Sequence, residues 1–269
     1  MDQLGPVSAA MIERLDIADD HQHLDIAAGT GEPGLSIARL SPKGRVVLTD
    51  LVAEMLDIAA RRAKALGIAN VETRVCSADD LPFNDATFDG ISVRFGYMFF
   101  PDVAKATAEF ARVLKPGGRL CSSVWVKPED NPWTTIAMQA IATEAVVAPP
   151  DPDGPNMWFR CAAPGFVGAL YEGAGLRDIA EWDVDVALVS GSPAQYWDMI
   201  SEHVSLAVAA LQQVDEPARW RSPTVPLLTR CWRPGRAGRA RGRRRTAVYS
   251  RPRRKGASPG GTHQSSRAT

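Results

Sequence analysis

The chain has 269 residues, of which 45% are hydrophobic, and this is enough to bury the core of one large α/β domain or two small ones. Its formal net charge of zero hides a division, because all 31 acidic residues lie at or before Glu216, whereas 15 of the 31 Lys and Arg residues lie from Arg219 onward. No apolar stretch is long enough to span a bilayer, and the N-terminus has neither a basic start nor an apolar centre. These features exclude a membrane-spanning or secreted protein, and we expect a cytoplasmic one.

We expect no metal site. The four cysteines are scattered without a C-x-x-C pair and are best interpreted as buried, reduced thiols: Cys76, Cys121, Cys161 and Cys231. His21 and His23 flank the start of the first predicted strand. With no further ligand nearby in the sequence, we expect surface histidines rather than a metal pair.

A glycine-rich loop organises the first half of the chain. Residues 7–15 predict a short amphipathic helix, and residues 24–34, LDIAAGTGEPG, then predict a strand, a tight turn and the start of a helix. Gly29 suits the positive φ of a sharp turn, and Gly31 and Gly34 allow a ligand or a helix to approach the backbone closely. Glycine triplets also occur in plain turns, so this loop alone only suggests a nucleotide-cofactor site.

A second strand, residues 44–50, ends in Asp50 and is followed by a predicted helix over residues 53–68. Its inward-facing side chains should be Met55, Ile58, Ala59 and Leu66. A carboxylate at the tip of the second parallel strand can accept from both hydroxyls of a ribose. The alternative is that Asp50 is an ordinary helix N-cap.

The remaining elements of the first half continue the alternation of strand and helix. Residues 71–83 and 87–95 each contain a strand, residues 101–114 predict a helix that stops at KPGG, and residues 118–126 predict the fifth strand. This pattern predicts an α/β fold with a doubly wound, Rossmann-like, mostly parallel sheet. Ligands of such sheets bind at the carboxyl ends of the strands, where the glycine loop, Asp50, residues 77–79 and Arg94 all fall.

Four ordered motifs resemble the class I S-adenosylmethionine-dependent methyltransferases, most closely the ubiquinone/menaquinone-biosynthesis branch. They are LDIAAGTGEPG, VVLTDLVAEML, DDLPFNDATFDGISVRFG and RVLKPGGRL. The resemblance implies a seven-stranded sheet in the order 3-2-1-4-5-7-6, with the seventh strand antiparallel between the fifth and sixth. It also implies that the chain moves a methyl group from S-adenosylmethionine to a small molecule by in-line displacement.

The resemblance assigns roles to residues at the carboxyl edge of the sheet. The glycine loop and Asp25 would hold the methionine part of the cofactor, Asp50 the ribose hydroxyls, and Met55 would pack near the adenine. One departure concerns the adenine amino group, whose usual aspartate acceptor is replaced by Ser77, although Asp79 could reach in. The full implied cofactor set is Asp25, Ala27, Gly29, Thr30, Gly31, Asp50, Leu51, Met55, Ser77, Ala78, Asp79 and Arg94.

The second half predicts helices over residues 131–147, 163–175 and 192–214, with a sixth strand over residues 176–189. In the resembled family, helices at these places cover the acceptor pocket. The side chains that would make such a pocket apolar and aromatic are Trp133, Met138, Met157, Trp158, Phe159 and Tyr196, although each could instead be a core residue. A general base is needed only if the acceptor loses a proton, and the candidates are Tyr97 and His203.

We divide the chain into a methyltransferase domain, residues 1–218, and a basic tail, residues 219–269. The domain has its core at residues 20–126 and its covering and C-terminal elements at residues 127–218. The arginine-rich tail could bind nucleic acid through its charge, but it has few aromatic residues and no motif, which favours a disordered segment. A dinucleotide-dependent oxidoreductase of the NAD type is the other alternative, and the later motifs disfavour it.

Only six strands are convincing before Glu216, so the seventh strand should lie in the tail. There the acidic residues vanish and the composition turns to Arg, Pro, Gly, Ala and Ser, as expected when a GC-rich gene is read in a shifted frame. Residues 225–232 and 246–250 are the only stretches that could substitute as a strand. We therefore expect the fifth and sixth strands to expose unpaired edges.

Overall fold

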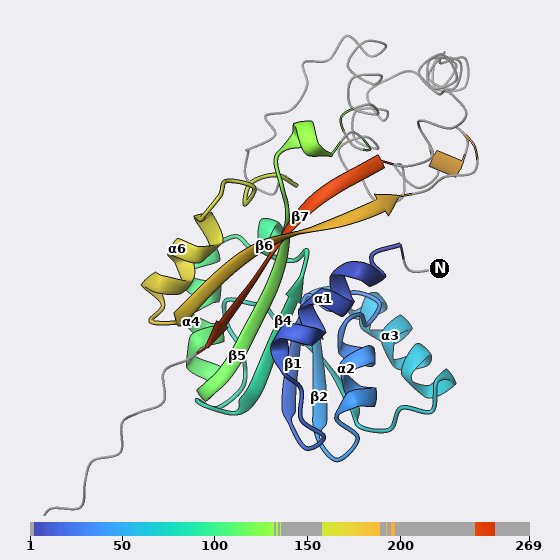
Figure 1. The fold of residues 1–269 in the computed structure, drawn as a ribbon. Helices are drawn as coiled ribbons and strands as arrows, with labels where there is room; N and C mark the ends of the chain where they lie inside the picture. Colours follow the sequence, from blue (N-terminus) through green and yellow to red (C-terminus); the bar gives the residue numbers. More distant parts are fainter. Residues whose placement is uncertain are drawn as a thin grey trace, which may run out of the picture.

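A computed structural model describes residues 3–131, 133, 135, 158–188, 192, 195–196 and 240–250. Its centre is a seven-stranded sheet in the order β3-β2-β1-β4-β5-β7-β6 (Figure 1), which confirms the strand order that the resemblance implied. The strands are β1 (Gln22–Ile26), β2 (Arg45–Asp50), β3 (Val71–Val75), β4 (Phe88–Arg94), β5 (Leu114–Trp125), β6 (Arg177–Leu188) and β7 (Ala240–Ser250). The first five are parallel to one another, and β7 runs antiparallel to both of its neighbours.

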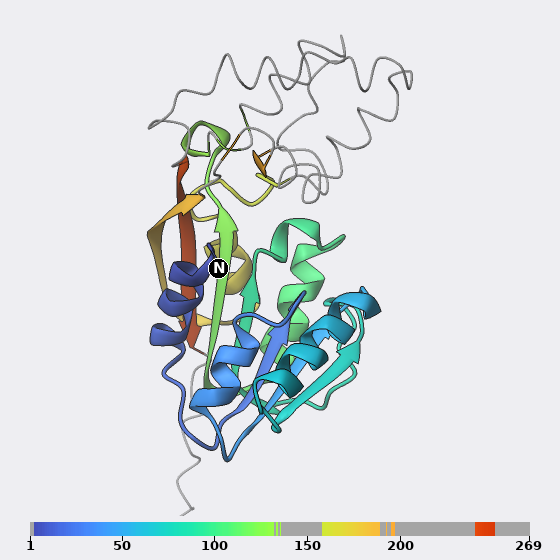
Figure 2. The ribbon, with the colours of Figure 1, turned by 90° about the vertical axis from the view of Figure 1, so that its right-hand side faces the viewer.

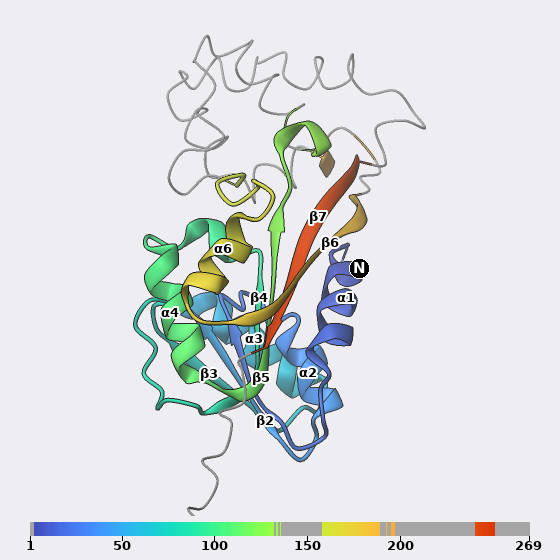
Figure 3. The same ribbon diagram turned by 60° about the vertical axis from the view of Figure 1, so that its left-hand side comes forward.

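Helices cover both faces of the sheet (Figures 2 and 3). The α-helices are α1 (Gly5–Leu15), α2 (Gly34–Leu40), α3 (Ala53–Ala65), α4 (Val103–Val113) and α6 (Phe166–Gly173). Figure 3 shows α4 and α6 on one side of the sheet and α1 and α2 on the other. Two short 3-10 turns, η1 (Tyr97–Phe99) and η2 (Pro128–Asp130), follow β4 and β5.

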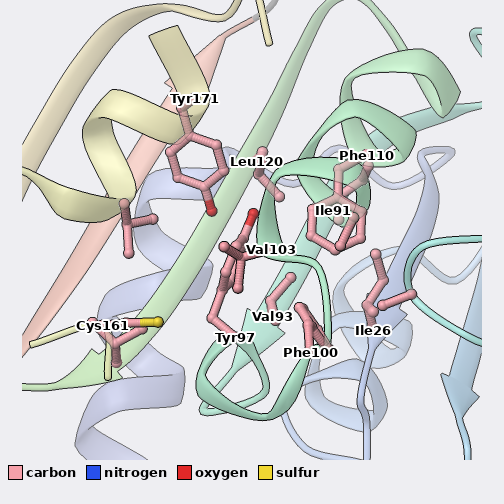
Figure 4. Packing of buried hydrophobic residues seen from close by; sticks show 14 of the residues in the cluster. Ile26, Ile91, Val93, Tyr97, Phe100, Val103, Phe110, Leu120, Cys161 and Tyr171 are labelled. Atoms are coloured by element: carbon pink, nitrogen blue, oxygen red, sulfur yellow. The ribbon is translucent and has the colours of Figure 1, made fainter. Parts of the chain in front are cut away.

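Each face of the sheet has its own apolar core. One cluster packs α1, α2 and α3 against the sheet, with Met11, Leu35 and Leu56 among its buried members. The other packs α4 and α6 against the opposite face (Figure 4), where the hydroxyl groups of Tyr97 and Tyr171 point toward one another. Burial on both faces explains why the central strands read as continuous apolar runs.

Two expectations about which side chains are buried are wrong. On α3 the buried residues are Leu56, Ala59 and Ala63, whereas Met55 is 42% exposed and Leu66 is 46% exposed. Ala59 is buried as predicted and Ile58 is half-buried, so the inward face of the helix is only partly the predicted one. His23 is not on the surface either: it is fully buried, because β1 is covered on both faces.

The expected absence of a seventh strand is also wrong. Residues 240–250 pair with β5 through Arg119↔Ser250 to Trp125↔Arg244, and with β6 along nearly the whole strand. Over these eleven residues the chain belongs to the sheet, and it includes the stretch 246–250 that we had named as a possible substitute. The rest of the predicted tail lies outside the described residues, as do residues 136–157 and most of the predicted helix over 192–214.

The register places positions of opposite charge side by side in sequence terms. Asp183 of β6 is paired with residue 245 and Asp185 with residue 243, and both of these β7 positions are arginines. The arginine-rich segment is thus paired with a strand that carries acidic residues.

We predict that β7 is required for stability. A chain that ends at residue 239 should unfold at least about 3 kcal/mol more easily, because each lost ladder bond contributes about 0.5–1.5 kcal/mol, and it should self-associate through the bared edges. A chain that ends at Ser250 keeps β7 and is the matched control. Urea unfolding followed by circular dichroism checks the prediction, and equal stability of the two truncated chains would show that β7 adds nothing.

Candidate functional site

The ends of β1 and β2 are joined by a carboxylate–backbone contact. The Asp50 carboxylate accepts the Gly29 N–H at 2.9 Å through one oxygen and the Val52 N–H at 3.0 Å through the other. Asp50 thus fixes the position of the glycine loop relative to the residues that lead into α3. Each carboxylate oxygen has a second lone pair, so Asp50 keeps the capacity to accept from ligand hydroxyls.

The glycine loop turns through several left-handed residues. Gly29 has φ +52° and Gly31 has φ +107°, while Ala27, which has a Cβ, is held at φ 52°. The Arg62 guanidinium of α3 donates to the Thr30 carbonyl oxygen at 2.5 Å and fixes the outer side of the loop. The loop is consequently held in one shape from both sides, and Ala27 carries backbone strain of the kind often found at ligand sites.

Asp25 lies beneath this loop rather than on its surface. The residue is fully buried; one oxygen accepts the Gly34 N–H at 2.9 Å and the other accepts the Ser92 hydroxyl at 2.5 Å. Burial raises the pKa of Asp25 to about 7, against the lowering effects of Ser92, Gly34 and Arg94. In the described structure Asp25 shapes the loop, through the first residue of α2.

Large apolar side chains are exposed beside Asp50. Leu51 is 64% exposed, Met55 is 42% exposed, and both follow Asp50 within five residues in the sequence. Exposed apolar side chains at the carboxyl end of a strand suit a flat, weakly polar ligand group, because they can pack over it when it binds. The exposure of Met55 agrees with the ligand-contacting role that the resemblance gave it.

The loop after β3 brings Ser77 and Asp79 together. The Ser77 hydroxyl donates to Asp79, and this bond, with Lys105 at 3.7 Å from the same carboxylate, keeps the pKa of Asp79 below its ordinary value. Because the Ser77 proton is used on Asp79, the Ser77 oxygen remains available as an acceptor. Ala78 between them is buried.

Arg94 ends β4 and links the site to the N-terminal helix. Its guanidinium donates to the Ser8 hydroxyl of α1 at 3.1 Å. The next residue, Phe95, has φ 58°, a conformation that is costly for a side chain of this size. Its ring lies 5.0 Å from that of Trp125, so the strained residue directs an aromatic ring toward the end of β5.

An aromatic cluster stands at the carboxyl end of β5. The ring of Trp125 lies 4.5 Å from that of Trp133 and 5.8 Å from that of Trp158, and Trp133 and Trp158 are 5.1 Å apart. Phe99 contacts Trp158 edge-on at 6.4 Å and is itself 47% exposed. We call Phe95, Phe99, Trp125, Trp133 and Trp158 the aromatic cluster.

The structure joins this cluster to the glycine loop. Gly96 follows Phe95, and a Cβ at Gly96 would lie 2.7 Å from the Ala27 Cβ, so the two loops touch. Of the predicted acceptor-side residues, Trp133 and Trp158 are in the cluster, Phe159 is buried in the same core and Tyr196 donates to the Trp133 carbonyl oxygen. Met138 and Met157 lie outside the described residues.

Of the two candidate bases, the structure describes only Tyr97. Tyr97 is fully buried, bonds to Thr107 at 3.1 Å, and has its pKa raised by burial, so it is a core residue. His203 lies outside the described residues. Within the described part of the chain, no group of three or more His, Cys, Asp or Glu residues could hold a metal ion, and no helix is long and apolar enough to cross a membrane.

Sequence reasoning missed three residues that hold the site. Ser92 and Arg62 act on the glycine loop from strands and helices distant in sequence, and Trp125 anchors the aromatic cluster. Trp125 could have been found, since an aromatic residue at the carboxyl end of a parallel strand falls at the ligand edge. No local pattern marks Ser92 or Arg62.

Comparisons with known proteins agree with this geometry. Residues 9–143 match the ubiE/COQ5 methyltransferase family. The chain is 41% identical over 122 residues to the ubiquinone/menaquinone biosynthesis C-methyltransferase UbiE of Cellvibrio japonicus, covering 45% of this chain and 49% of that protein. It is 44% identical over 99 residues to the demethylmenaquinone methyltransferase of Thermus thermophilus, covering 36% of this chain and 44% of that protein.

The chain therefore spans about half the length of the curated relatives it matches, or less. Among solved structures, a putative methyltransferase from Bacillus halodurans has the same fold, with a TM-score of 0.59 and 20% identity over 91% of this chain and 98% of that one. The fold is thus the Rossmann-like fold of the class I methyltransferases. With the family match extending over half of its length, the chain belongs to the ubiE/COQ5 methyltransferase family.

Proposed function

We propose that this chain binds S-adenosylmethionine at the carboxyl ends of β1 and β2 and transfers its methyl group to a small ring molecule of the quinone type. The observation that carries the proposal is the contact between the Asp50 carboxylate and the Gly29 N–H, at 2.9 Å. This contact links the Asp50 carboxylate, which can accept from ribose hydroxyls, to the glycine loop, whose backbone a ligand can approach. Family membership supplies the reaction class.

The residues present fit this cofactor. Asp50 can accept from ribose hydroxyls, and the exposed side chains of Leu51 and Met55 offer apolar surface for an adenine ring. Ser77 retains an acceptor for an exocyclic amino group. The fit is made by residues on three separate loops, after β1, β2 and β3.

Bound S-adenosylmethionine would supply an electrophilic methyl group on a sulfonium. The protein's part in such a displacement is to align the acceptor and to exclude water, and positioning of this kind can lower a barrier by about 7–11 kcal/mol. The aromatic cluster lies beside the glycine loop and presents the exposed edge of Phe99 and the half-buried ring of Trp158. Stacked aromatic surface suits a planar acceptor ring.

The cofactor assignment predicts the effect of Asp50→Ala. Removing the carboxylate should weaken binding of S-adenosylmethionine by about 1–3 kcal/mol, since it leaves hydroxyl partners unpaired and releases the Gly29 N–H. Isothermal titration calorimetry measures the loss. Asp57→Ala, at an exposed position of α3, is the matched control and should bind as the parent does. Binding of NAD in place of S-adenosylmethionine, or unchanged binding by Asp50→Ala, would overturn the assignment.

The acceptor assignment predicts a separate effect of Trp158→Ala. With 1,4-dihydroxynaphthalene as the acceptor, the product should gain the mass of one CH2 unit, because the transferred methyl group replaces a hydrogen that leaves as a proton. The variant should raise KM by up to about tenfold, because an aromatic pair contributes about 0.5–1.5 kcal/mol. Cofactor affinity should stay at the parent value, because Trp158 does not belong to the loops after β1, β2 and β3 that are proposed to hold the cofactor. A variant that lost cofactor affinity and kept its KM would contradict the proposed place of the acceptor.

A further inference from the structure

Three buried polar side chains form a chain of hydrogen bonds beneath the glycine loop. His23 and Asp25 lie two residues apart on one face of β1, and Ser92 lies on β4 at the position paired with Asp25. Ser92 Oγ is 2.5 Å from Asp25 Oδ1 and 3.1 Å from His23 Nε2, and all three residues are fully buried. Polar groups in such a place are costly unless each is satisfied.

Space for the imidazole is provided by Gly90, the residue paired with His23 on β4. A Cβ at Gly90 would lie 2.6 Å from His23 Nδ1, so no other residue fits there while the ring keeps its place. Nδ1 itself is buried and has no hydrogen-bond partner within the described structure. The ring is thus held by packing on one side and by a single hydrogen bond to Ser92 on the other.

The single hydroxyl proton of Ser92 links the donor and acceptor roles in its two hydrogen bonds, to Asp25 and to His23. When Asp25 is ionised it can only accept, so Ser92 donates to it and must accept from His23 Nε2–H, which leaves Nδ1 bare. When Asp25 is protonated on Oδ1, it donates to Ser92 instead. If Ser92 then donates to Nε2, His23 must carry its proton on the buried Nδ1, where this N–H finds no acceptor. If Nε2–H keeps donating to the second lone pair of Ser92, the buried Ser92 hydroxyl proton loses its acceptor.

The arrangement therefore opposes protonation of Asp25, which burial by itself would promote. Burial raises the pKa of Asp25 to about 7; Ser92, the Gly34 N–H and Arg94 lower it, and Glu32 raises it. For His23, burial and the neighbouring His21 lower the pKa to about 3, against the raising effect of Asp89. His23 is accordingly neutral at any pH above about 4, and while Asp25 is ionised it donates from Nε2.

We propose that His23 and Ser92 are positioning residues that keep Asp25 a carboxylate beneath the glycine loop. We call the hydrogen bonds among His23, Ser92 and Asp25 the relay. The loop binds the positively charged amino group of the cofactor's methionine part only while the relay is intact. The proposal rests on the proposed function. Its consequence is that affinity for the methionine part falls as Asp25 takes up a proton near neutral pH.

The relay also sets how stability depends on pH. The pKa of Asp25 is higher in the folded than in the unfolded protein. Its contribution to the free energy of unfolding is therefore present below about pH 4 and is lost as pH rises through about 7. His23 has its folded pKa below its unfolded value of 6.5, so its contribution is present above that pH and is lost as pH falls toward 3. Between about pH 4 and 6.5 the two slopes oppose each other.

The substitution His23→Leu should remove the pH dependence that His23 contributes to stability and leave that of Asp25. From pH 4 to 6.5 the stability of the variant should fall relative to the parent, approaching tenfold in the unfolding equilibrium constant for each pH unit. Urea unfolding at half-unit pH intervals measures the difference. A pH-independent difference between the two proteins would show that His23 is not held neutral in the folded state.

Binding of S-adenosylhomocysteine and of adenosine to the full chain, measured by calorimetry from pH 5.5 to 8.5, tests the relay itself. S-adenosylhomocysteine carries the methionine amino group, and its affinity should fall as pH drops below 7, approaching about tenfold for each unit. Adenosine lacks this group and should bind equally at all these values. Ser92→Ala should lower affinity for S-adenosylhomocysteine about tenfold at pH 7.5, and Ser92→Thr, which keeps the hydroxyl, should restore it.

The outcomes separate the two proposals. If neither ligand binds, the proposed function fails. If both bind but neither depends on pH, or if adenosine shows the same dependence as S-adenosylhomocysteine, the relay is refuted. Nitrogen-15 NMR of the imidazole of His23 tests it in the free parent protein, so poor folding of a variant does not weaken the test. The proton should be on Nε2 at pH 8, and a proton on Nδ1 there would overturn the proposal.

Discussion

The buried carboxyl group of Asp25 is the constraint on which the candidate site depends. It ties three elements together, since it belongs to β1, accepts from Ser92 of β4, and accepts from Gly34 at the start of α2. A buried acidic side chain is expensive, and the protein offsets the cost with donors on both oxygens. The gain is a glycine loop whose entry and exit are both fixed, so that little remains to be ordered when a ligand binds.

Other contacts extend this order across the sheet. Asp50 holds the loop from β2, and Arg62 of α3 holds its outer side. On the far half, α1 lies against the C-terminal strands: the Arg14 guanidinium stacks over the Trp182 ring at 3.9 Å, and Arg119 of β5 donates to the Arg14 carbonyl oxygen at 2.9 Å. The N-terminal helix therefore connects the β5–β7–β6 half of the sheet to the half that forms the site.

Much of this arrangement could be predicted from the sequence, because parallel strands and their loops leave local patterns. The glycine loop, the acid at the end of β2 and the alternation of strand and helix are all visible in short windows. His23 could not be placed, since β1 is buried on both faces and has no alternation to show which residues face inward. Ser92 meets Asp25 only through strand pairing, 67 residues along the chain.

The strand β7 shows a different limit of sequence reasoning. Its arginine-rich composition resembles a disordered tail when considered alone, and its place in the sheet is visible only in the pairing with β5 and β6. Similarly, Met55 has the spacing of a core residue on α3, yet it is exposed at the mouth of the site. In both cases the deciding information lies in a partner, a strand or a ligand, that the local sequence does not contain.

The central claim is that the loops after β1, β2 and β3 together bind the cofactor. The most direct measurement is amide NMR of the full chain during titration with S-adenosylhomocysteine. The largest shift changes should fall at Gly29, Val52 and Ser77, since these residues lie on or beside the three loops. Changes confined to the strand β7, or spread evenly over the sheet without these three amides, would contradict the account.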